Sequence, residues 1–542
     1  MKRINLAVVV IFLSIHSFAQ SANNIIPAPV KFETVQLSPV QLGSNSILYY
    51  SKAFETQAKY LRDELQKQSG VTLALQEMTQ TKKIPASGII LLFDSVTISK
   101  AEMYTLESGG ERVLILAKDI RGFVNAAQTL LQLLPLKKQS TITVPSVAIT
   151  DYPQFSYRGM HLDVVRHIFP VSYIKKYIDY LTFHKFNTFH WHLTDDQGWR
   201  FEISSYPKLN SISSWRDSTL IGHFKDAPAR YDGKRYGGFY TKAEIKEIVA
   251  YANTRGITII PELDIPGHSR AAIAAYPQLS TKPDTVWNVA TTWGMYNRQN
   301  NVLAPTDFTF RFLKSVFKEL TELFPSTYIH IGGDECSRMW WKQDKKTQQF
   351  MQKNNLKDET ALQTYFIEYI ASYLKTLNRK AIGWHEIAEG DLDTSTLIMN
   401  WADEKQALSA AKKGFNIIMT PGVPFYFDHF QSKDPNDSLA IKGYNSLEAV
   451  YTYKVIPDAV QKAKLRNKIV GAQANVWTEY MGYSTKVDYM IFPRMTALSE
   501  NLWSKTKSYP DFLRRLEQFM IPRYQSWNSS YFKGYRIWTK DK

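Results

Sequence analysis

Short apolar runs recur along the C-terminal two thirds of the chain, and longer segments with helical periodicity separate most of them. Apolar side chains three or four residues apart predict helices over residues 172–185 and 242–256. Near-continuous apolar runs are typical of parallel strands that are buried on both faces. Eight such runs with helical connections predict a (β/α)8 TIM barrel. The runs are 159–164, 187–194, 256–263, 327–333, 380–386, 396–402, 415–422 and 469–477.

Two connections depart from this alternation. Residues 385–395 are too few for a helical crossover, which needs a dozen residues or more, so we expect no helix between the fifth and sixth strands. Residues 421–468, after the seventh strand, form a long connection with little helical pattern. We expect this second connection to be rich in loops.

The first 150 residues alternate on a smaller scale. Residues 54–70 carry apolar side chains at helical spacing, residues 112–119 form a strand-like run, and residues 122–135 are amphipathic and end in proline. This alternation predicts a small α/β domain before the barrel. The expected domains are an N-terminal α/β domain of α+β sandwich type at 22–150, the barrel at 151–505, and a C-terminal helix and tail packed on the barrel at 506–542.

The N-terminal segment has the pattern of a secretory signal. Lys2 and Arg3 precede an apolar run from Leu6 to Ile15, and small residues follow at positions 17 and 19. The run is too short for a transmembrane helix, and no later stretch approaches the roughly 18 apolar residues that one requires. No cysteine lies at the cleavage point to carry a lipid. We expect residues 1–19 to be a signal peptide and the mature protein to be secreted or periplasmic, without stable membrane insertion.

Composition limits the classes of function. The chain has 542 residues with 44% hydrophobic composition, enough for a large core. Cys336 is the only cysteine, so no internal disulfide can form, and we expect it to be a small buried residue. The net charge is +16, but the lysines and arginines are scattered. This distribution favours a solvated basic surface over nucleic-acid binding, with an acidic glycan partner as an alternative.

Acidic and aromatic residues follow the predicted strands where each strand ends. In HIGGDEC, residues 330–336, two glycines allow a sharp turn before Asp334 and Glu335. Chemistry on TIM barrels gathers at the C-terminal ends of the strands. Aromatic rings pack on the C–H faces of sugars and carboxylates bind hydroxyls, so we interpret the barrel mouth as a sugar site. The other strand ends supply Asp163, Asp195, Asp196, Glu262, Asp264, His268, Trp384, His385, Glu386, Trp401, Asp403, Tyr426, Asp428, Trp477 and Glu479.

Seven stretches occur in a characteristic order: FSYRGMHLDVVRHIFP, HWHLTDDQGWR, PELDIPGHSRAA, HIGGDE, WHE, PFYFDHF and GAQANVWTE. They resemble the glycoside hydrolases of family 20, the β-N-acetylhexosaminidases, over about residues 154–505. Residues 122–134 resemble the small N-terminal domain of that family. The resemblance implies an exo-acting, retaining enzyme, without cofactor or metal, that removes terminal β-linked GlcNAc or GalNAc from glycans or chitooligosaccharides.

The resemblance also implies substrate-assisted catalysis, in which the 2-acetamido group of the substrate attacks the anomeric carbon and forms an oxazolinium ion. Adjacent residues cannot easily flank a glycosidic bond from opposite sides, which agrees with this mechanism. By position, Glu335 is expected to be the general acid and base, holding its proton near neutral pH. Asp334 is expected to stay ionised and to accept a hydrogen bond from the acetamido N–H.

Nine substrate-binding residues are carried over from the same resemblance. An alternative for Arg158 is a structural ion pair with an acid such as Asp163, and an alternative for His268 is a turn histidine. Tyr426 is expected to bind the acetamido oxygen; Trp384, Trp401 and Trp477 to enclose its methyl group and support the ring; Arg158, Asp428 and Glu479 to bind outer hydroxyls; and Asp195 and His268 to tune the acid.

Two other functions remain open from the residues alone. His190 and His192, with Asp195 and His268, could be the ligands of a metal-dependent barrel hydrolase, although a metal site does not need the aromatics. A non-catalytic protein that binds N-acetylhexosamine could have the same pocket. His161, His190 and His192 have no assigned role, and a packing role is expected for the last two, which share one strand face.

Overall fold

The computed structural model describes residues 23–78, 83–390 and 392–540. The predicted signal peptide, residues 1–19, lies outside these ranges. Eight parallel strands form a closed barrel in chain order, which confirms the TIM-barrel prediction. The strands are β10 (Tyr157–Asp163), β11 (Thr188–His192), β18 (Thr258–Ile265), β19 (Tyr328–Gly332), β20 (Lys380–Trp384), β21 (Leu397–Asn400), β22 (Asn416–Met419) and β23 (Ile469–Ala474).

Closure follows from the register of the first and last strands. Tyr157 of β10 pairs with Gly471 of β23, and Met160 pairs with Ala474. Nearly all strand residues are buried, as expected for a parallel sheet covered by helices. The main covering helices are α3 (Val171–Phe183), α4 (Lys242–Thr254), α6 (Asp307–Leu323), α9 (Glu359–Thr376), α10 (Glu404–Lys412) and α15 (Arg494–Trp503).

The two unusual connections are present. Among the described residues between β20 and β21, a short 3₁₀ helix, η4 (His385–Glu389), is the only helix, so the expected absence of an α-helix in this part of the connection is confirmed. The connection from β22 to β23 contains four short helices between loops: α11 (Gly422–Phe425), α12 (Leu447–Thr452), α13 (Asp458–Lys462) and the 3₁₀ helix η5 (Arg466–Lys468). The first of them leads directly to residues at the barrel mouth.

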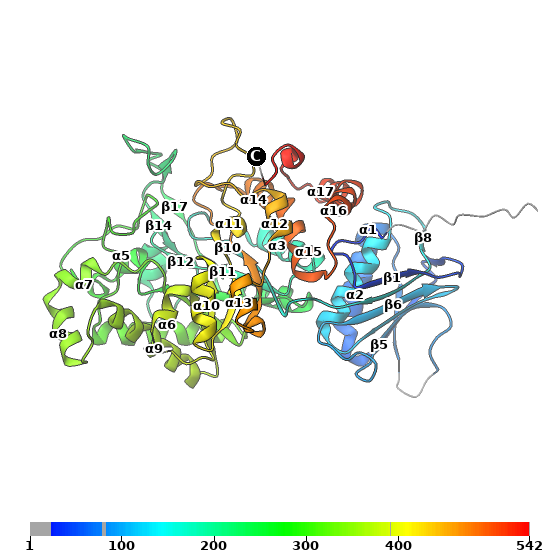
Figure 1. Cartoon of the computed structure of the whole chain (residues 1–542), viewed down its shortest axis with the longest axis horizontal. Coiled ribbons are helices and arrows are strands. Elements are labelled where there is room, and N and C mark those ends of the chain that lie inside the picture. The colour runs from blue at the N-terminus through cyan, green and yellow to red at the C-terminus, as the bar shows by residue number, and fades with distance from the viewer. Residues whose placement is uncertain (1–22, 79–82, 391, 541–542) are drawn as a thin grey trace, which may run out of the picture.

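The N-terminal unit is a seven-stranded sheet with the order β1-β9-β6-β7-β5-β3-β4. The predicted helices are present as α1 (Glu55–Ser69), which ends at Gly70 in the left-handed region, and α2 (Ile120–Leu133). Figure 1 shows α2 on the side of this unit that faces the barrel. The strands are β1 (Lys31–Thr34), β3 (Ile47–Ser51), β4 (Ala74–Met78), β5 (Gly88–Phe93), β6 (Tyr104–Gly109), β7 (Arg112–Ala117) and β9 (Val147–Asp151).

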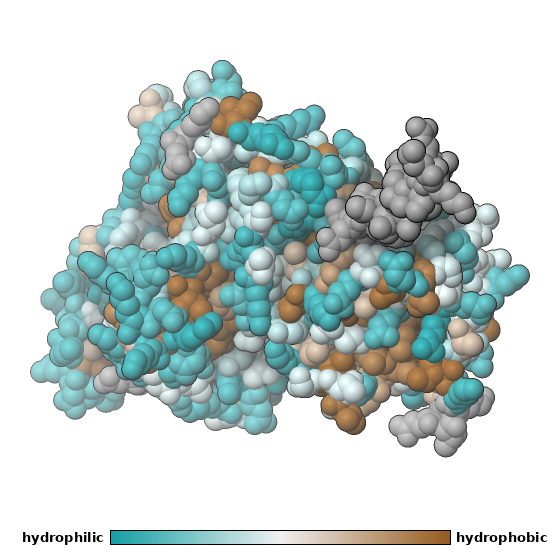
Figure 2. All heavy atoms as spheres, turned by 45° about the vertical axis from the view of Figure 1, so that its right-hand side comes forward, coloured by the Kyte–Doolittle hydropathy of each residue, from teal (hydrophilic) through white to brown (hydrophobic). Residues whose placement is uncertain are grey.

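After β23 the chain forms α14 (Ser484–Ile491) and α15, and then α16 (Tyr509–Arg515) and α17 (Ile521–Ser526). Arg515 of α16 pairs with the buried Glu500 of α15 at 2.6 Å, which fastens the C-terminal helices to the barrel. The expected domain boundaries at residues 150 and 505 stay predictions. Among the described residues, no helix is long and apolar enough to cross a membrane. Figure 2 shows polar side chains over most of the visible face, with apolar ones gathered over the N-terminal unit.

Buried charges join the two units at the N-terminal ends of the barrel strands. Arg158, at the start of β10, forms an ion pair with Glu102 of the N-terminal unit and donates to the carbonyl of Lys185 at 2.9 Å. The Lys185 ammonium pairs with Asp151 at 2.8 Å, and both of these side chains are fully buried. These two buried cations of the barrel therefore have their counter-charges on the N-terminal unit.

The prediction that Arg158 binds substrate is wrong. Its guanidinium lies at the end of the barrel opposite the mouth, because it comes early in its strand. It is 1% exposed and lies over the ring of Trp503, 5.0 Å from the centroid. A structural ion pair was the alternative, but the partner is Glu102 and not Asp163.

Replacing Arg158 with methionine is expected to lower the free energy of unfolding by about 3 kcal/mol, because Glu102 would lose its main counter-charge while remaining buried. Differential scanning calorimetry would measure the loss, and activity per folded molecule should be unchanged. The Lys59→Met variant removes an exposed pair with Glu55 and should stay within about 0.5 kcal/mol of the parent. An unchanged melting temperature for Arg158→Met would contradict the interface described above.

Candidate active site

The turn after β19 places the adjacent acids at the barrel mouth. Gly332 and Gly333 have φ of 67° and 96°, in the left-handed region that favours glycine. A Cβ at Gly332 would lie 1.6 Å from Oδ1 of Asp264, and one at Gly333 would lie 2.3 Å from Cγ2 of Ile387. Any other residue would therefore displace this turn. Cys336 beyond it is 6% exposed, and burial raises the pKa of its thiol, which confirms the expected buried, unreactive role.

A cavity of about 410 Å³ opens at the C-terminal ends of the strands. Residues from seven of the eight strand-end segments meet there, so the mouth brings together many of the predicted acids and aromatics. The cavity lining does not include Asp163, Glu262, Trp384, His385, Glu386 or Asp403. The lining residues are Arg166, Asp195, Asp196, Gln197, Phe224, Asp264, His268, Trp293, Gly294, Met295, Asp334, Glu335, Trp401, Gly422, Tyr426, Asp428, His429, Ile441, Lys442, Trp477 and Glu479.

Asp334 and Glu335 occupy different environments in this cavity. The Asp334 side chain is 14% exposed and its Oδ1 has no hydrogen-bond partner, whereas the Glu335 side chain is 47% exposed. Burial raises the pKa of Asp334 to about 7. The adjacent His268 ring lowers the pKa of Glu335. When the pair holds one proton, these shifts place it on Asp334, which is the reverse of the assignment expected from the sequence.

His268 links the two acids to a buried network. Its Nε2 lies 3.8 Å from Oδ2 of Asp334 and 3.7 Å from Oε2 of Glu335, too far for direct hydrogen bonds but close enough for strong charge interaction. Its Nδ1 bonds Asp195 at 3.0 Å. Although burial opposes the charge, Asp195 raises the pKa of His268 well above its ordinary value. His268 is thus held as a cation beside the acids.

Behind Asp195 the network continues through His192 to Glu262. Nε2 of His192 lies 2.8 Å from Asp195, and its Nδ1 bonds Glu262. Burial opposes a charge on His192, but Glu262 and Asp195 together raise its pKa to about 10. His190 also contacts Glu262, at 3.1 Å. The histidines expected only to pack therefore belong to a buried charge network behind the acids.

This network does not fit the metal site considered from the sequence. Both ring nitrogens of His192 are occupied by carboxylates, so neither is free for a metal. Within the described ranges, three groups of residues could hold an ion, but none combines His190, His192, Asp195 and His268. The groups are His161 with His190 and Glu262, Asp195 with Asp196 and His268, and Asp264 with His268 and Asp334.

The aromatic residues divide into an inner and an outer set. Trp401 and Trp477 line the cavity, and the Trp477 ring lies 6.0 Å from that of Trp384. Trp384 is 1% exposed and donates from Nε1 to Glu262 at 2.9 Å, so it supports the floor from behind. Tyr426 lines the cavity, and burial and the charge of Asp428 raise the pKa of its hydroxyl, which stays a hydrogen-bond donor.

Two further acids face the cavity with free oxygens. Oδ1 of Asp428 and Oε2 of Glu479 are buried without a hydrogen-bond partner. Burial raises the pKa of both side chains. Buried carboxylate oxygens normally have donors, and the hydroxyls of a bound sugar would supply them.

Arg166 is the cation that sequence reasoning missed. It lies three residues after Asp163 within the quoted stretch VVRH, beyond the end of β10. Its Nη2 lies 2.9 Å from Asp195 and 4.0 Å from Glu479, and its guanidinium lies over the Trp477 ring at 5.2 Å. Its position just beyond the end of a predicted strand could have identified it as a residue of the barrel mouth. This residue, and not Arg158, brings a guanidinium to the cavity.

The cavity combines adjacent carboxylates, a charged imidazole, aromatic rings and unpartnered acceptor oxygens. This arrangement can bind and cleave a glycoside. Residues 155–506 match the family model described as glycosyl hydrolase family 20, catalytic domain, and residues 22–152 match domain 2 of the same family. The chain belongs to glycosyl hydrolase family 20. The resemblance drawn from the seven stretches is thereby confirmed.

Relatives within family 20 cover almost the whole chain. A β-hexosaminidase of Porphyromonas gingivalis is 39% identical over 512 residues, which are 92% of this chain and 63% of that protein. The crystal structure of a family 20 exo-β-N-acetylglucosaminidase from Vibrio harveyi in complex with N-acetylglucosamine has a TM-score of 0.80 and 31% identity, covering 94% of this chain and 78% of that one. The β-N-acetylhexosaminidase of Bacteroides fragilis has a TM-score of 0.78 and 29% identity, covering 94% and 96%.

Proposed function

We propose that this protein is an exo-acting, retaining β-N-acetylhexosaminidase that removes terminal β-linked GlcNAc or GalNAc through an oxazolinium intermediate. The observation that carries the proposal is the placement of Asp334 and Glu335 side by side on one turn at a pocket lined by aromatic residues. Two carboxylates on one turn stand under the same sugar, so the acid has no enzyme nucleophile opposite it. Similar proteins named β-hexosaminidases support the substrate class.

In the first step, Asp334 accepts a hydrogen bond from the acetamido N–H, and the Tyr426 hydroxyl orients the acetamido oxygen. This oxygen attacks the anomeric carbon as the glycosidic bond breaks, and Glu335 gives its proton to the leaving oxygen. In the second step, Glu335 takes a proton from water, and the water oxygen attacks the anomeric carbon. The acetamide is thereby restored and the sugar keeps its β configuration.

Substrate binding is expected to favour an ionised Asp334 and a neutral Glu335, the protonation states that the mechanism requires. The acetamido N–H gives Asp334 the donor that its buried carboxylate is missing, which favours the ionised form. The bound sugar covers Glu335 and removes water from it, which favours the neutral form. The one proton of the pair is therefore expected to move from Asp334 to Glu335 when substrate binds.

The pH dependence of kcat/KM tests this shared proton, because it reports the ionisations of the free enzyme. The pair holds one proton from the lowered pKa of Glu335 up to the pKa of about 7 at Asp334. We expect a bell-shaped profile whose alkaline limb lies near pH 7, since above it the pair loses its last proton. In Asp334→Asn the alkaline limb should move to lower pH, because Glu335 alone then sets it. A limb that does not move would contradict the shared proton.

Hydrolysis of 4-nitrophenyl N-acetyl-β-glucosaminide tests the function, with NMR to identify the first anomer released. Release of the β anomer supports a retaining enzyme, whereas release of the α anomer would overturn the proposal. Binding of N-acetylglucosamine without turnover would favour the non-catalytic alternative. Activity that is lost after chelation and regained with zinc would favour the metal hydrolase.

We further propose that the protein is exported, since residues 1–19 have the charge and apolar pattern of a signal peptide. The N-terminal sequence of the protein purified from its native envelope or medium tests this. A mature chain that still begins at Met1 in the cytoplasm would contradict it.

A further inference from the structure

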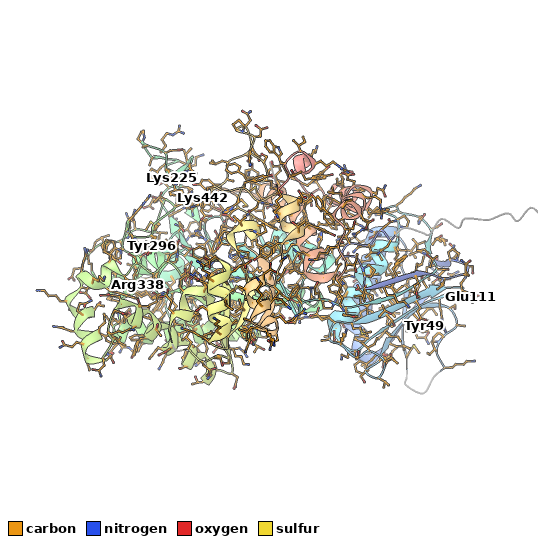
Figure 3. The ribbon with its side chains drawn as sticks, viewed as in Figure 1. Tyr49, Glu111, Lys225, Tyr296, Arg338 and Lys442 are labelled. Atoms are coloured by element: carbon orange, nitrogen blue, oxygen red, sulfur yellow. The ribbon has the colours of Figure 1, made fainter. Side chains whose placement is uncertain are left out.

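A group of cations lies around one aromatic ring at the outer edge of the cavity. Phe224 lines the cavity, and the ammonium of Lys225 and the guanidinium of Arg298 lie 5.7 and 5.8 Å from its ring centroid. Lys442 lines the same cavity. We call Phe224, Lys225, Arg298 and Lys442 the basic rim. Figure 3 labels Lys225 and Lys442 close together on the barrel, far from the N-terminal unit.

The rim is built from three segments that are held together. Nε2 of His223 lies 2.8 Å from the carbonyl oxygen of Ile441, which ties the segment before Lys225 to the one before Lys442. Gly294 lies against the Phe224 ring, where an added Cβ would be 3.0 Å from the ring carbons. The three long side chains therefore extend from one continuous edge, although they are distant in sequence.

The rim cations have no carboxylate of their own. All three are exposed, and among the described residues none has a carboxylate oxygen within the 4.0 Å of an ion pair. The nearest acid in sequence, Asp226, accepts a hydrogen bond from the His223 N–H at 2.8 Å. By contrast, Arg166 and His268, which also line the cavity, are both paired with Asp195. The rim thus presents positive charge to whatever enters the mouth.

The cavity below the rim has the opposite character. Its lining includes seven carboxylic acids: Asp195, Asp196, Asp264, Asp334, Glu335, Asp428 and Glu479. An anionic group on the sugar in the pocket would be repelled by those acids that stay ionised, among them Asp195 and Glu335, whose pKa values are lowered. The Glu335 side chain is 47% exposed whereas that of Asp334 is 14% exposed, so Glu335 is the acid on the solvent side of the pair, in the cavity that Phe224 and Lys442 also line. Because Glu335 is assigned to the leaving oxygen, the sugar beyond the cleaved bond is expected on that side. The rim is therefore positioned for the part of the substrate beyond the cleaved bond.

We propose that the basic rim selects glycans that carry an anionic group, a carboxylate or a sulfate, on the sugar next to the terminal N-acetylhexosamine. The Phe224 ring packs on the face of that sugar, and Lys225, Arg298 and Lys442 bind its anion. The inference rests on the proposed glycosidase function, because it assigns Glu335 to the leaving oxygen. It adds a substrate class to that function.

The experiment compares disaccharides that differ only in the anion. One pair has GlcNAc β-linked to glucuronic acid or to glucose, and the other has GlcNAc β-linked to 6-sulfogalactose or to galactose. Each is tested in the β1-3 and β1-4 linkages, with kcat and KM measured at low and high salt. The variant is K225Q/R298Q/K442Q, and the matched control is K405Q/K412Q/K462Q, which removes three exposed cations from α10 and α13.

We expect about a tenfold higher kcat/KM for at least one anionic substrate over its neutral partner, mostly through KM, from three exposed charge contacts. High salt and the rim variant should each abolish this preference, while the control variant should keep it. The pair that shows the preference identifies carboxylate or sulfate. Equal cleavage within both pairs, or a preference that survives in the rim variant, would overturn the inference but leave the proposed function intact. Failure to cleave any of these substrates, the aryl one included, would overturn both.

Discussion

Replacing Glu335 with glutamine is expected to lower kcat on chitobiose by about 10²–10⁴-fold, because the leaving sugar oxygen then receives no proton. The loss should be much smaller on a 2,4-dinitrophenyl glycoside, whose leaving group needs no proton in the first step. Steady-state kinetics on both substrates would separate a lost acid from a lost fold.

The matched control for this variant is Glu389→Gln. Glu389 is an exposed glutamate at the end of η4, paired with Arg338 at 3.3 Å, and it does not line the cavity. Its substitution should leave kcat unchanged. If Glu335→Gln kept full activity on chitobiose, the assignment of the general acid would be wrong.

A substrate without the acetamido group is expected to be almost inert. We predict that kcat/KM for 4-nitrophenyl β-glucoside is lower than that for the N-acetylglucosaminide by a factor of about 10⁴ or more. A nucleophile held within the same molecule can have an effective concentration of about 10⁵–10⁸ M, and the glucoside lacks it. Both rates can be measured from the release of nitrophenolate.

The Asp334→Asn variant supplies the internal check on this comparison. The asparagine cannot stabilise the positive charge of the oxazolinium ion, so hydrolysis of the N-acetylglucosaminide should fall by about 10²–10³-fold. The kcat/KM for the glucoside should barely change. The ratio of kcat/KM between the two substrates should therefore become smaller. Brisk cleavage of the glucoside by the parent enzyme would require a nucleophile from the protein and would contradict substrate assistance.

The barrel could be predicted from the sequence because each of its strands is an apolar run, and helical or loop-like segments separate one run from the next. The turn at Gly332 and Gly333 was also predictable, since the two glycines precede adjacent acids. Residues 385–395 were too few for a helix, and chain length alone decided that point. These features depend on local pattern, which a single sequence contains.

Features that depend on which side chains meet in space could not be predicted in the same way. Arg158 and Arg166 lie on the same stretch, and only the direction of β10 shows that Arg166 reaches the mouth and Arg158 the opposite end. The charge on His192 depends on Glu262, which lies 70 residues away in the sequence. The proton shared by Asp334 and Glu335 depends on burial and on His268, neither of which is visible in the motif.

The buried ion pairs between the two units have a consequence for how the gene can be divided. A polypeptide that began just before β10 would keep the buried Arg158 and Lys185. It would lack Glu102 and Asp151, the acids that pair with them. Such a fragment would have two unpaired positive side chains, Arg158 and Lys185, at the N-terminal ends of its strands. We therefore expect the two units to fold stably only together, and recombination at their junction to preserve stability best when all four charged positions are inherited as a set.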